Sequence, residues 1–195
     1  MAIVGGVVAI ALIAVAISKA SKQNSTREKL PLVGALGAFI FACQMFNFPI
    51  ATIGCSGHLV GGVLLAALLG PWLGFLTLAG VLTLQSLLFA DGGLLTLGWN
   101  IVNMAAIGAL VVYPLLFRPI ARGSGASPAR LFVASLVSST VAIALGATAV
   151  VIESALSNIS ALPMATFFAN MLPIHLLIGL CEGAITGLVV AIVAK

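Results

Sequence analysis

Two histidines, with a small set of carboxylates and amides, are the residues of this sequence whose side chains could bind a metal ion. His58 lies in the stretch CSGHLVGG, between glycines and at the start of an apolar run. Imidazole selects cobalt, nickel, copper or zinc over magnesium and calcium. Glycines beside it would let the backbone fold closely around a bound ion. We therefore predict that His58 is a metal ligand.

Further polar residues are predicted to line the same pocket or to orient the ligand. Carboxylates and amides can orient a ligating imidazole through its second nitrogen. His175 and Glu182 are seven residues apart and would share one helix face. We expect these two to be hydrogen-bonded to each other rather than to be ligands. The predicted pocket residues are Gln44, Asn47, Asp91, Asn100, Asn103, His175 and Glu182.

Each candidate also has an ordinary structural interpretation. His58 would cap the start of a helix, and Asp91 would cap a turn with Gly92 and Gly93. Glu153 would be a solvated charge at the membrane interface. The amides would form hydrogen bonds between helices. These alternatives stay open at the level of sequence.

The three cysteines are odd in number and widely spaced, so they indicate neither a disulfide framework nor a CxxC metal site. Cys43 and Cys181 are interpreted as small apolar side chains. Cys55 lies close to His58 and keeps a possible role as a ligand.

The composition identifies the elements that must position these residues. The chain has 195 residues, of which 62% are hydrophobic and 6% are charged, whereas soluble domains carry about 25% charge. About 20 apolar residues span a bilayer, so we predict an all-α, polytopic membrane protein that forms a single integral membrane domain over 1–195. About seven transmembrane helices are expected, at Ile3–Ser18, Leu30–Phe48, His58–Leu69, Trp72–Ala90, Leu97–Phe117, Leu131–Ile152 and within Pro163–Lys195.

Basic residues predict the orientation in the cell membrane. The eight Lys and Arg residues lie in three regions, 19–29, 118–130 and Lys195, which mark cytoplasmic ends by the positive-inside rule. Seven spans then place the N-terminus outside and the C-terminus in the cytoplasm. The polar residues above fall at the outer ends of the spans, which predicts an outward-facing pocket. The positive charge is no sign of nucleic-acid binding.

A small-residue face is predicted on the last span, where Gly179, Gly183 and Gly187 recur every four residues. Such faces let two helices approach closely. We expect this one to pack within the chain, and the alternative is a docking face for a partner subunit.

Three functions are compatible with these features. The first is the substrate-binding subunit of a transition-metal transporter; the sequence holds no GxxxxGK[ST] motif, so an ATPase would be another chain. The second is a rhomboid-like intramembrane serine protease, in which Ser56 of the GCSG stretch at 54–57 would be the nucleophile and His175 the base. No HxxxN-type oxyanion stabiliser precedes Ser56, which argues against it. The third is a passive channel or a structural subunit.

Three long motifs resemble a known family. The stretches SGHLVGG, LLFADGG and HLLIGLCEGAIT resemble the CbiM/NikM substrate-binding membrane subunits of energy-coupling-factor (ECF) transporters for cobalt and nickel. The resemblance implies an ECF substrate-subunit-like bundle with an extra N-terminal helix, in which His58 is a metal ligand. It also implies Co²⁺ or Ni²⁺ as the transported substrate, without an organic cofactor, and a link to cobalamin biosynthesis.

The resemblance also implies partners and a second group of ligands. The partners are a transmembrane coupling subunit of CbiQ/NikQ type, ATPase subunits of CbiO/NikO type and a small accessory membrane protein. Family members typically begin Met-His, and that segment ligates the metal together with the histidine of the SGH motif. This sequence begins Met1-Ala2. We expect a start codon that was assigned too late; otherwise Cys55, His175 or a partner chain would supply further ligands.

Overall fold

The protein is almost entirely helical in its computed structural model, which describes residues 1–23, 26–50, 55–122, 127–159 and 162–194. The helix Leu97–Ala121 is continuous and comprises α5 (Leu97–Asn100), the π-helical segment η2 (Ile101–Phe117) and α6 (Arg118–Ala121). The predicted all-α fold is confirmed, and the described residues form seven helical segments where about seven transmembrane helices were expected. The other six segments are α1 (Ala2–Ser21), α2 (Leu30–Gln44), α3 (Gly62–Leu69), α4 (Pro71–Leu88), α7 (Pro128–Leu156) and α8 (Met164–Val193).

Five of these segments are long and apolar enough to cross a membrane, and α2 and α3 are shorter. At 1.5 Å per residue, the eight residues of α3 extend only about 12 Å, well under the ~30 Å of a hydrocarbon core. The expected span His58–Leu69 is thus a loop followed by a short helix. The chain then turns at Gly70, whose φ is +93°, and Pro71 occupies the first turn of α4.

A small antiparallel hairpin replaces the loop expected at Asn47–Gly57. Strands β1 (Phe48–Ile50) and β2 (Cys55–Gly57) pair with Phe48 opposite Gly57 and Ile50 opposite Cys55. Where water is scarce, backbone N–H and C=O groups must find partners in the protein, and strand pairing supplies them here. The loop that carries His58 follows β2 directly.

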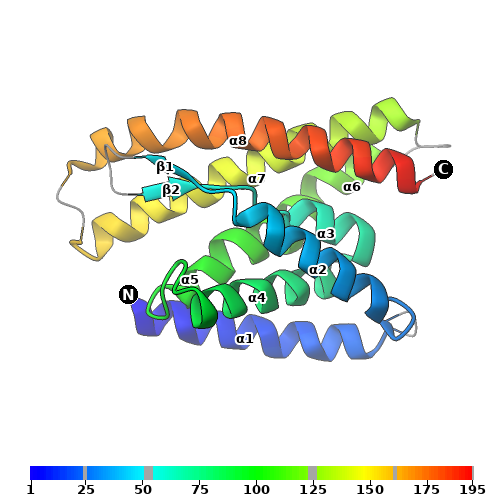
Figure 1. Ribbon diagram of the computed structural model, residues 1–195, viewed down its shortest axis with the longest axis horizontal. Helices are drawn as coiled ribbons and strands as arrows, with labels where there is room; N and C mark the ends of the chain where they lie inside the picture. The colour runs from blue at the N-terminus through cyan, green and yellow to red at the C-terminus, as the bar shows by residue number, and fades with distance from the viewer. Residues whose placement is uncertain (24–25, 51–54, 123–126, 160–161, 195) are drawn as a thin grey trace.

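The helices form two layers (Figure 1). The antiparallel pair α7 and α8 makes one layer, α1 and α4 lie in the other, and α3 lies in the interior, where Leu65 is fully buried. A Cβ added to Gly183 would lie 2.6 Å from the Leu136 Cα, and one added to Gly179 would lie 2.7 Å from the Thr140 Cα. The glycine face of α8 therefore packs against α7, as expected, rather than being free for a partner.

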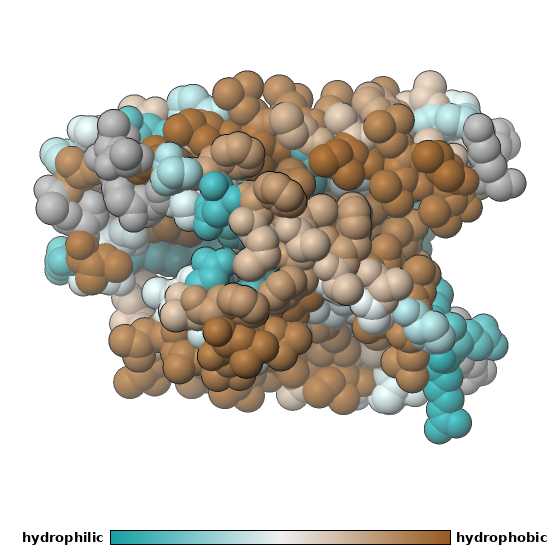
Figure 2. Space-filling model, viewed as in Figure 1, coloured by the Kyte–Doolittle hydropathy of each residue, from teal (hydrophilic) through white to brown (hydrophobic). Residues whose placement is uncertain are grey.

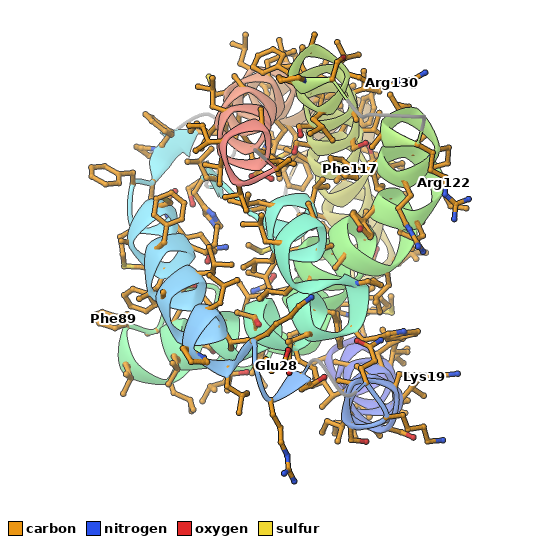
Figure 3. All side chains as sticks on the ribbon, turned by 90° about the vertical axis from the view of Figure 1, so that its right-hand side faces the viewer. Lys19, Glu28, Phe89, Phe117, Arg122 and Arg130 are labelled. Carbon is orange, nitrogen blue, oxygen red and sulfur yellow. The ribbon has the colours of Figure 1, made fainter. Side chains whose placement is uncertain are left out.

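Charge and apolar surface are segregated on the molecule. Apolar side chains cover most of the visible surface in Figure 2, as a lipid environment requires. Lys19, Arg122 and Arg130 extend from the end of the molecule that faces the viewer in Figure 3. This basic end is opposite the hairpin and the marked N-terminus (Figure 1). Lys195 lies outside the described residues.

Candidate functional site

A cavity of about 480 Å³ lies between the two helix layers and is bounded by β2, the loop before α3, the α4–α5 connection, η2, α7 and α8. Figure 2 shows hydrophilic side chains in a hollow between the layers, towards the hairpin. The structure thus brings together polar residues that the sequence separates by more than 100 positions. Six of the eight predicted site residues line this cavity: His58, Asp91, Asn100, Asn103, His175 and Glu182.

His58 projects from the loop between β2 and α3 and is half-buried. Its Nδ1 lies 2.7 Å from the backbone oxygen of Leu59. A carbonyl oxygen only accepts hydrogen bonds, so Nδ1 carries the proton. In the neutral ring, Nε2 then keeps its lone pair. His58 therefore presents an unprotonated nitrogen as a potential ligand.

Glu182 and Gln44 hold the backbone of the His58 loop. The Glu182 Oε2 accepts a hydrogen bond of 2.5 Å from the Val60 N–H, and the Gly61 N–H is a second donor to this carboxylate. The Gln44 Nε2 donates to the Val60 oxygen at 2.8 Å. Gln44 is fully buried and does not line the cavity described above. Gln44 therefore supports the loop backbone rather than facing the cavity.

The prediction that His175 and Glu182 are hydrogen-bonded to each other is wrong. The Nδ1 of His175 instead lies 2.8 Å from the Met171 oxygen, one turn earlier in α8. Seven residues of helix separate the two side chains by about 10 Å along the axis, which exceeds a direct hydrogen bond. A shared helix face brought both residues to the cavity but did not make them partners.

The ring of His175 lies against Gly57. A Cβ added to Gly57 would be 3.5 Å from the His175 Nε2 and 2.5 Å from the Ile178 Cδ1. His58 and His175 both line the cavity. The hairpin is therefore pressed onto α8 at this point, and both imidazoles face one cavity.

The turn between α4 and α5 contributes Asp91 and Asn100. The hydroxyl of Thr96 donates to the carbonyl oxygens of Gly92 and Gly93, and Asn100 Nδ2 donates to the Gly92 oxygen at 3.3 Å. Within the described residues, Thr96 and Asn100 are the side chains bonded to this turn, so the prediction that Asp91 caps it is wrong. Asp91 lines the cavity and is half-buried.

Asn103 links two helices beside the cavity. Its Nδ2 donates to the Glu153 Oε2 at 3.0 Å and so joins η2 to α7. Glu153 is thus hydrogen-bonded to a neighbouring helix and is not simply a solvated charge. Asn47, in contrast, is exposed and does not line the cavity, so its predicted place in the pocket is wrong.

The structure does not form the serine–histidine pair of the protease hypothesis. Ser56 is exposed at the rim of the cavity. The hydrogen bond of His175 goes to the Met171 oxygen, and none joins Ser56 to His175 within the described residues. Gly54, the first residue of the predicted GxSG motif, lies outside the described residues, as does the side chain of Cys55.

The sequence prediction did not include every side chain of the cavity. Met104, Met171 and Thr96 also line the cavity. The spacing of four between Met171 and His175 places both on one helix face and could have identified the methionine. Across the described ranges, no group of three or more His, Cys, Asp or Glu side chains is arranged to hold a metal. His58 and His175 are the imidazoles that the cavity offers.

Comparisons with known proteins agree with these features. A family model described as "Cobalt uptake substrate-specific transmembrane region" matches residues 1–195. A protein of Haloquadratum walsbyi described as a metal transport protein is 38% identical, over 82% of this chain and 69% of its own length. The cobalt transport protein CbiM of Sorangium cellulosum is 35% identical, over 80% of this chain and 69% of its own length.

Longer relatives and solved structures extend the comparison. A protein of Archaeoglobus fulgidus described as a fused nickel transport protein, NikMN, is 40% identical over 84% of this chain, which spans only 52% of that protein. The crystal structure of a transition metal transporter matches with a TM-score of 0.85 and 31% identity, over 98% of this chain and 87% of the other. A truncated transition metal transporter gives a TM-score of 0.86, also at 31% identity, over 98% of this chain and 92% of the other.

Proposed function

This chain belongs to the CbiM family, the substrate-specific membrane component of cobalt and nickel uptake, and we propose that it captures Co²⁺ or Ni²⁺ in the cavity around His58. The proposal rests on the hydrogen bonding of the His58 ring. Its Nδ1 proton is committed to the Leu59 carbonyl, so the Nε2 lone pair is available to an ion in the cavity.

The surroundings of His58 suit a divalent cation. The carboxylates of Asp91 and Glu182 line the cavity, which contains no Lys or Arg among its described lining residues. Opposite charges attract strongly where water is scarce. Nitrogen donors favour cobalt and nickel over the hard cations magnesium and calcium. His175 contributes a second imidazole beside the site, and Asn100 and Asn103 contribute amides.

The charge distribution supports a proposal for the orientation in the cell membrane. The cavity lies towards the hairpin and the N-terminus, whereas Lys19, Arg122 and Arg130 extend from the opposite end (Figures 1 and 3). By the positive-inside rule, the basic end is cytoplasmic. We therefore propose that the cavity opens to the outside, with the N-terminus outside and the C-terminus in the cytoplasm.

Energy for import is proposed to come from other chains. The sequence has no nucleotide-binding GxxxxGK[ST] motif. We propose that this chain is not an enzyme and that it acts as the substrate-capture subunit of an ECF-type importer. Its proposed partners are a CbiQ/NikQ-type coupling subunit, CbiO/NikO-type ATPases and a small accessory membrane protein.

The test is a calorimetric titration of Ni²⁺ and of Co²⁺ into the detergent-purified chain and into three variants. Losing a residue that only orients a ligand costs about 10–100-fold in metal affinity, so His58→Ala should cost more than about 100-fold. His175→Ala, which removes a neighbouring group, should cost less than His58→Ala. Asn47→Ala is the matched control, because Asn47 is exposed and outside the cavity. Binding that survives unchanged in His58→Ala would contradict the proposed site.

A further inference from the structure

The peptide unit between Leu59 and Val60 is hydrogen-bonded at both of its ends. At one end, its N–H, on Val60, donates to the Glu182 carboxylate at 2.5 Å. At the other end, its oxygen, on Leu59, accepts from His58 Nδ1 at 2.7 Å. A peptide unit is planar and rigid. One rigid group therefore connects a buried carboxylate of α8 to the imidazole that faces the cavity.

The carboxylate of Glu182 needs these hydrogen bonds. Its side chain is 4% exposed, and no salt bridge to it is present among the described residues. A buried ionisable group without a partner is costly in a membrane protein. The amides of Val60 and Gly61, at the N-terminus of α3, are the donors that stabilise it, and the positive end of the helix dipole favours negative charge there.

A second side chain fixes the same loop from the other direction. Gln44, on α2, donates to the oxygen of Val60 at 2.8 Å and is fully buried. The loop is thus tied to α8 through an N–H and to α2 through a carbonyl oxygen. Neither Gln44 nor Glu182 needs to contact a bound ion to control where His58 points.

We propose that Glu182 is a positioning residue that acts on His58 through the Leu59–Val60 peptide, forming a carboxylate–peptide–imidazole relay. The inference rests on the proposed metal capture. In many metal sites, a carboxylate bonded directly to the second nitrogen of a ligating histidine fixes its tautomer and raises its basicity. Here the peptide stands between the two groups. Hydrogen bonds in a chain polarise one another, so the charge on Glu182 strengthens the Leu59 oxygen as an acceptor and makes Nε2 of His58 a better donor to the ion.

The relay predicts a tautomer that can be measured without any metal. The chain contains two histidines, His58 and His175, so ¹⁵N-histidine labelling gives a spectrum of only two rings. Their ¹⁵N shifts would be recorded in metal-free protein at mildly alkaline pH, with a His175→Gln variant to assign them. We expect the proton on Nδ1 of both rings in the unaltered chain.

Glu182→Gln is the decisive variant, because glutamine keeps a carbonyl acceptor for the Val60 N–H but removes the charge. We expect His58 to become a mixture of tautomers and Ni²⁺ affinity to fall about 10–100-fold. His175 is an internal control, because its Nδ1 is bonded within α8 to Met171, and its shifts should not change. Glu28→Gln is the external control, since Glu28 is exposed and lies at the basic end (Figure 3).

The outcomes separate the relay from the proposed function. A His58 ring that carries its proton on Nε2 in the unaltered chain overturns the relay, even if Glu182→Gln fails to fold. So does a Glu182→Gln variant in which the His58 shifts are unchanged, whatever its metal affinity. If the tautomers behave as expected but the unaltered chain binds neither Ni²⁺ nor Co²⁺, then the relay stands and metal capture by this chain is contradicted.

Discussion

Replacing Gly61 by alanine should destabilise the loop that carries His58. Gly61 immediately precedes α3 and has φ +84°, in the left-handed region. A Cβ at this position would lie 2.3 Å from Ile40 Cδ1 and 3.1 Å from Ile40 Cγ1. Ile40 is 3% exposed and is part of the main core. The substitution therefore introduces both backbone strain and overpacking.

The two contributions can be estimated separately. A left-handed conformation costs an L-residue other than glycine roughly 1–2 kcal/mol. Overpacking a well-packed core costs about 1–3 kcal/mol. Gly61→Ala should therefore lower the free energy of unfolding by about 2–5 kcal/mol, with the lower value if the Ile40 Cδ1 rotates away. Adding Ile40→Val removes that methyl group and should recover part of the overpacking, but none of the backbone strain.

Unfolding in detergent, monitored by intrinsic fluorescence and circular dichroism, measures the change in the free energy of unfolding for the two single variants and the double variant. The double-mutant cycle should give a favourable coupling energy between positions 40 and 61. Gly80→Ala is the matched control, because a Cβ there meets nothing within 4 Å inside α4, and alanine should gain about 0.5–1 kcal/mol. A Gly61→Ala protein as stable as the unaltered chain would refute the loop geometry from which the relay was inferred.

Two further substitutions test how the helices are joined. Gly183→Ala should lower the free energy of unfolding by about 1–3 kcal/mol, because its Cβ would lie 2.6 Å from the backbone of Leu136. The same detergent unfolding assay measures this change. Unchanged stability would contradict close packing of α7 on α8. Asn103→Ala should cost about 1–2 kcal/mol, because it removes the donor at 3.0 Å from a partly buried Glu153 carboxylate. In a Glu153→Gln background, which already lacks the charge, replacing Asn103 by alanine should lower the free energy of unfolding by less. Equal losses in both backgrounds would show that the charge of Glu153 does not strengthen this hydrogen bond.

Helix periodicity and end charges predicted much of the candidate site. Asn100 and Asn103 are three residues apart, and the sequence alone places them on one helix face at one end of a span. The polar side chains at the outer ends of several spans were then expected to face one another inside the bundle, because polar groups avoid lipid. Asn47 was expected in the pocket, whereas it is exposed just before β1, and nothing in the residues 47–57 indicated that a hairpin begins there.

The partners of these side chains could not be predicted in the same way. The sequence suggested that Glu182 pairs with His175 on its own helix, whereas Glu182 pairs with the backbone of Val60, 122 residues away. The sequence also suggested that Asp91 caps the turn after α4, whereas Thr96 does so. Hydrogen bonds depend on distances of a few tenths of an ångström, and these follow from the packing of neighbouring helices rather than from spacing along one of them.

By itself, the sequence determined that the chain is a bundle of apolar helices with a basic end, and that its polar side chains gather towards the other end. These properties follow from local composition, because each residue must suit lipid, water or an interface whatever its neighbours are. Only the tertiary structure decided the direction in which His58 points. That direction depends on Gln44 from α2 and Glu182 from α8 meeting one loop, and a contact among three distant segments exists only after the helices have packed.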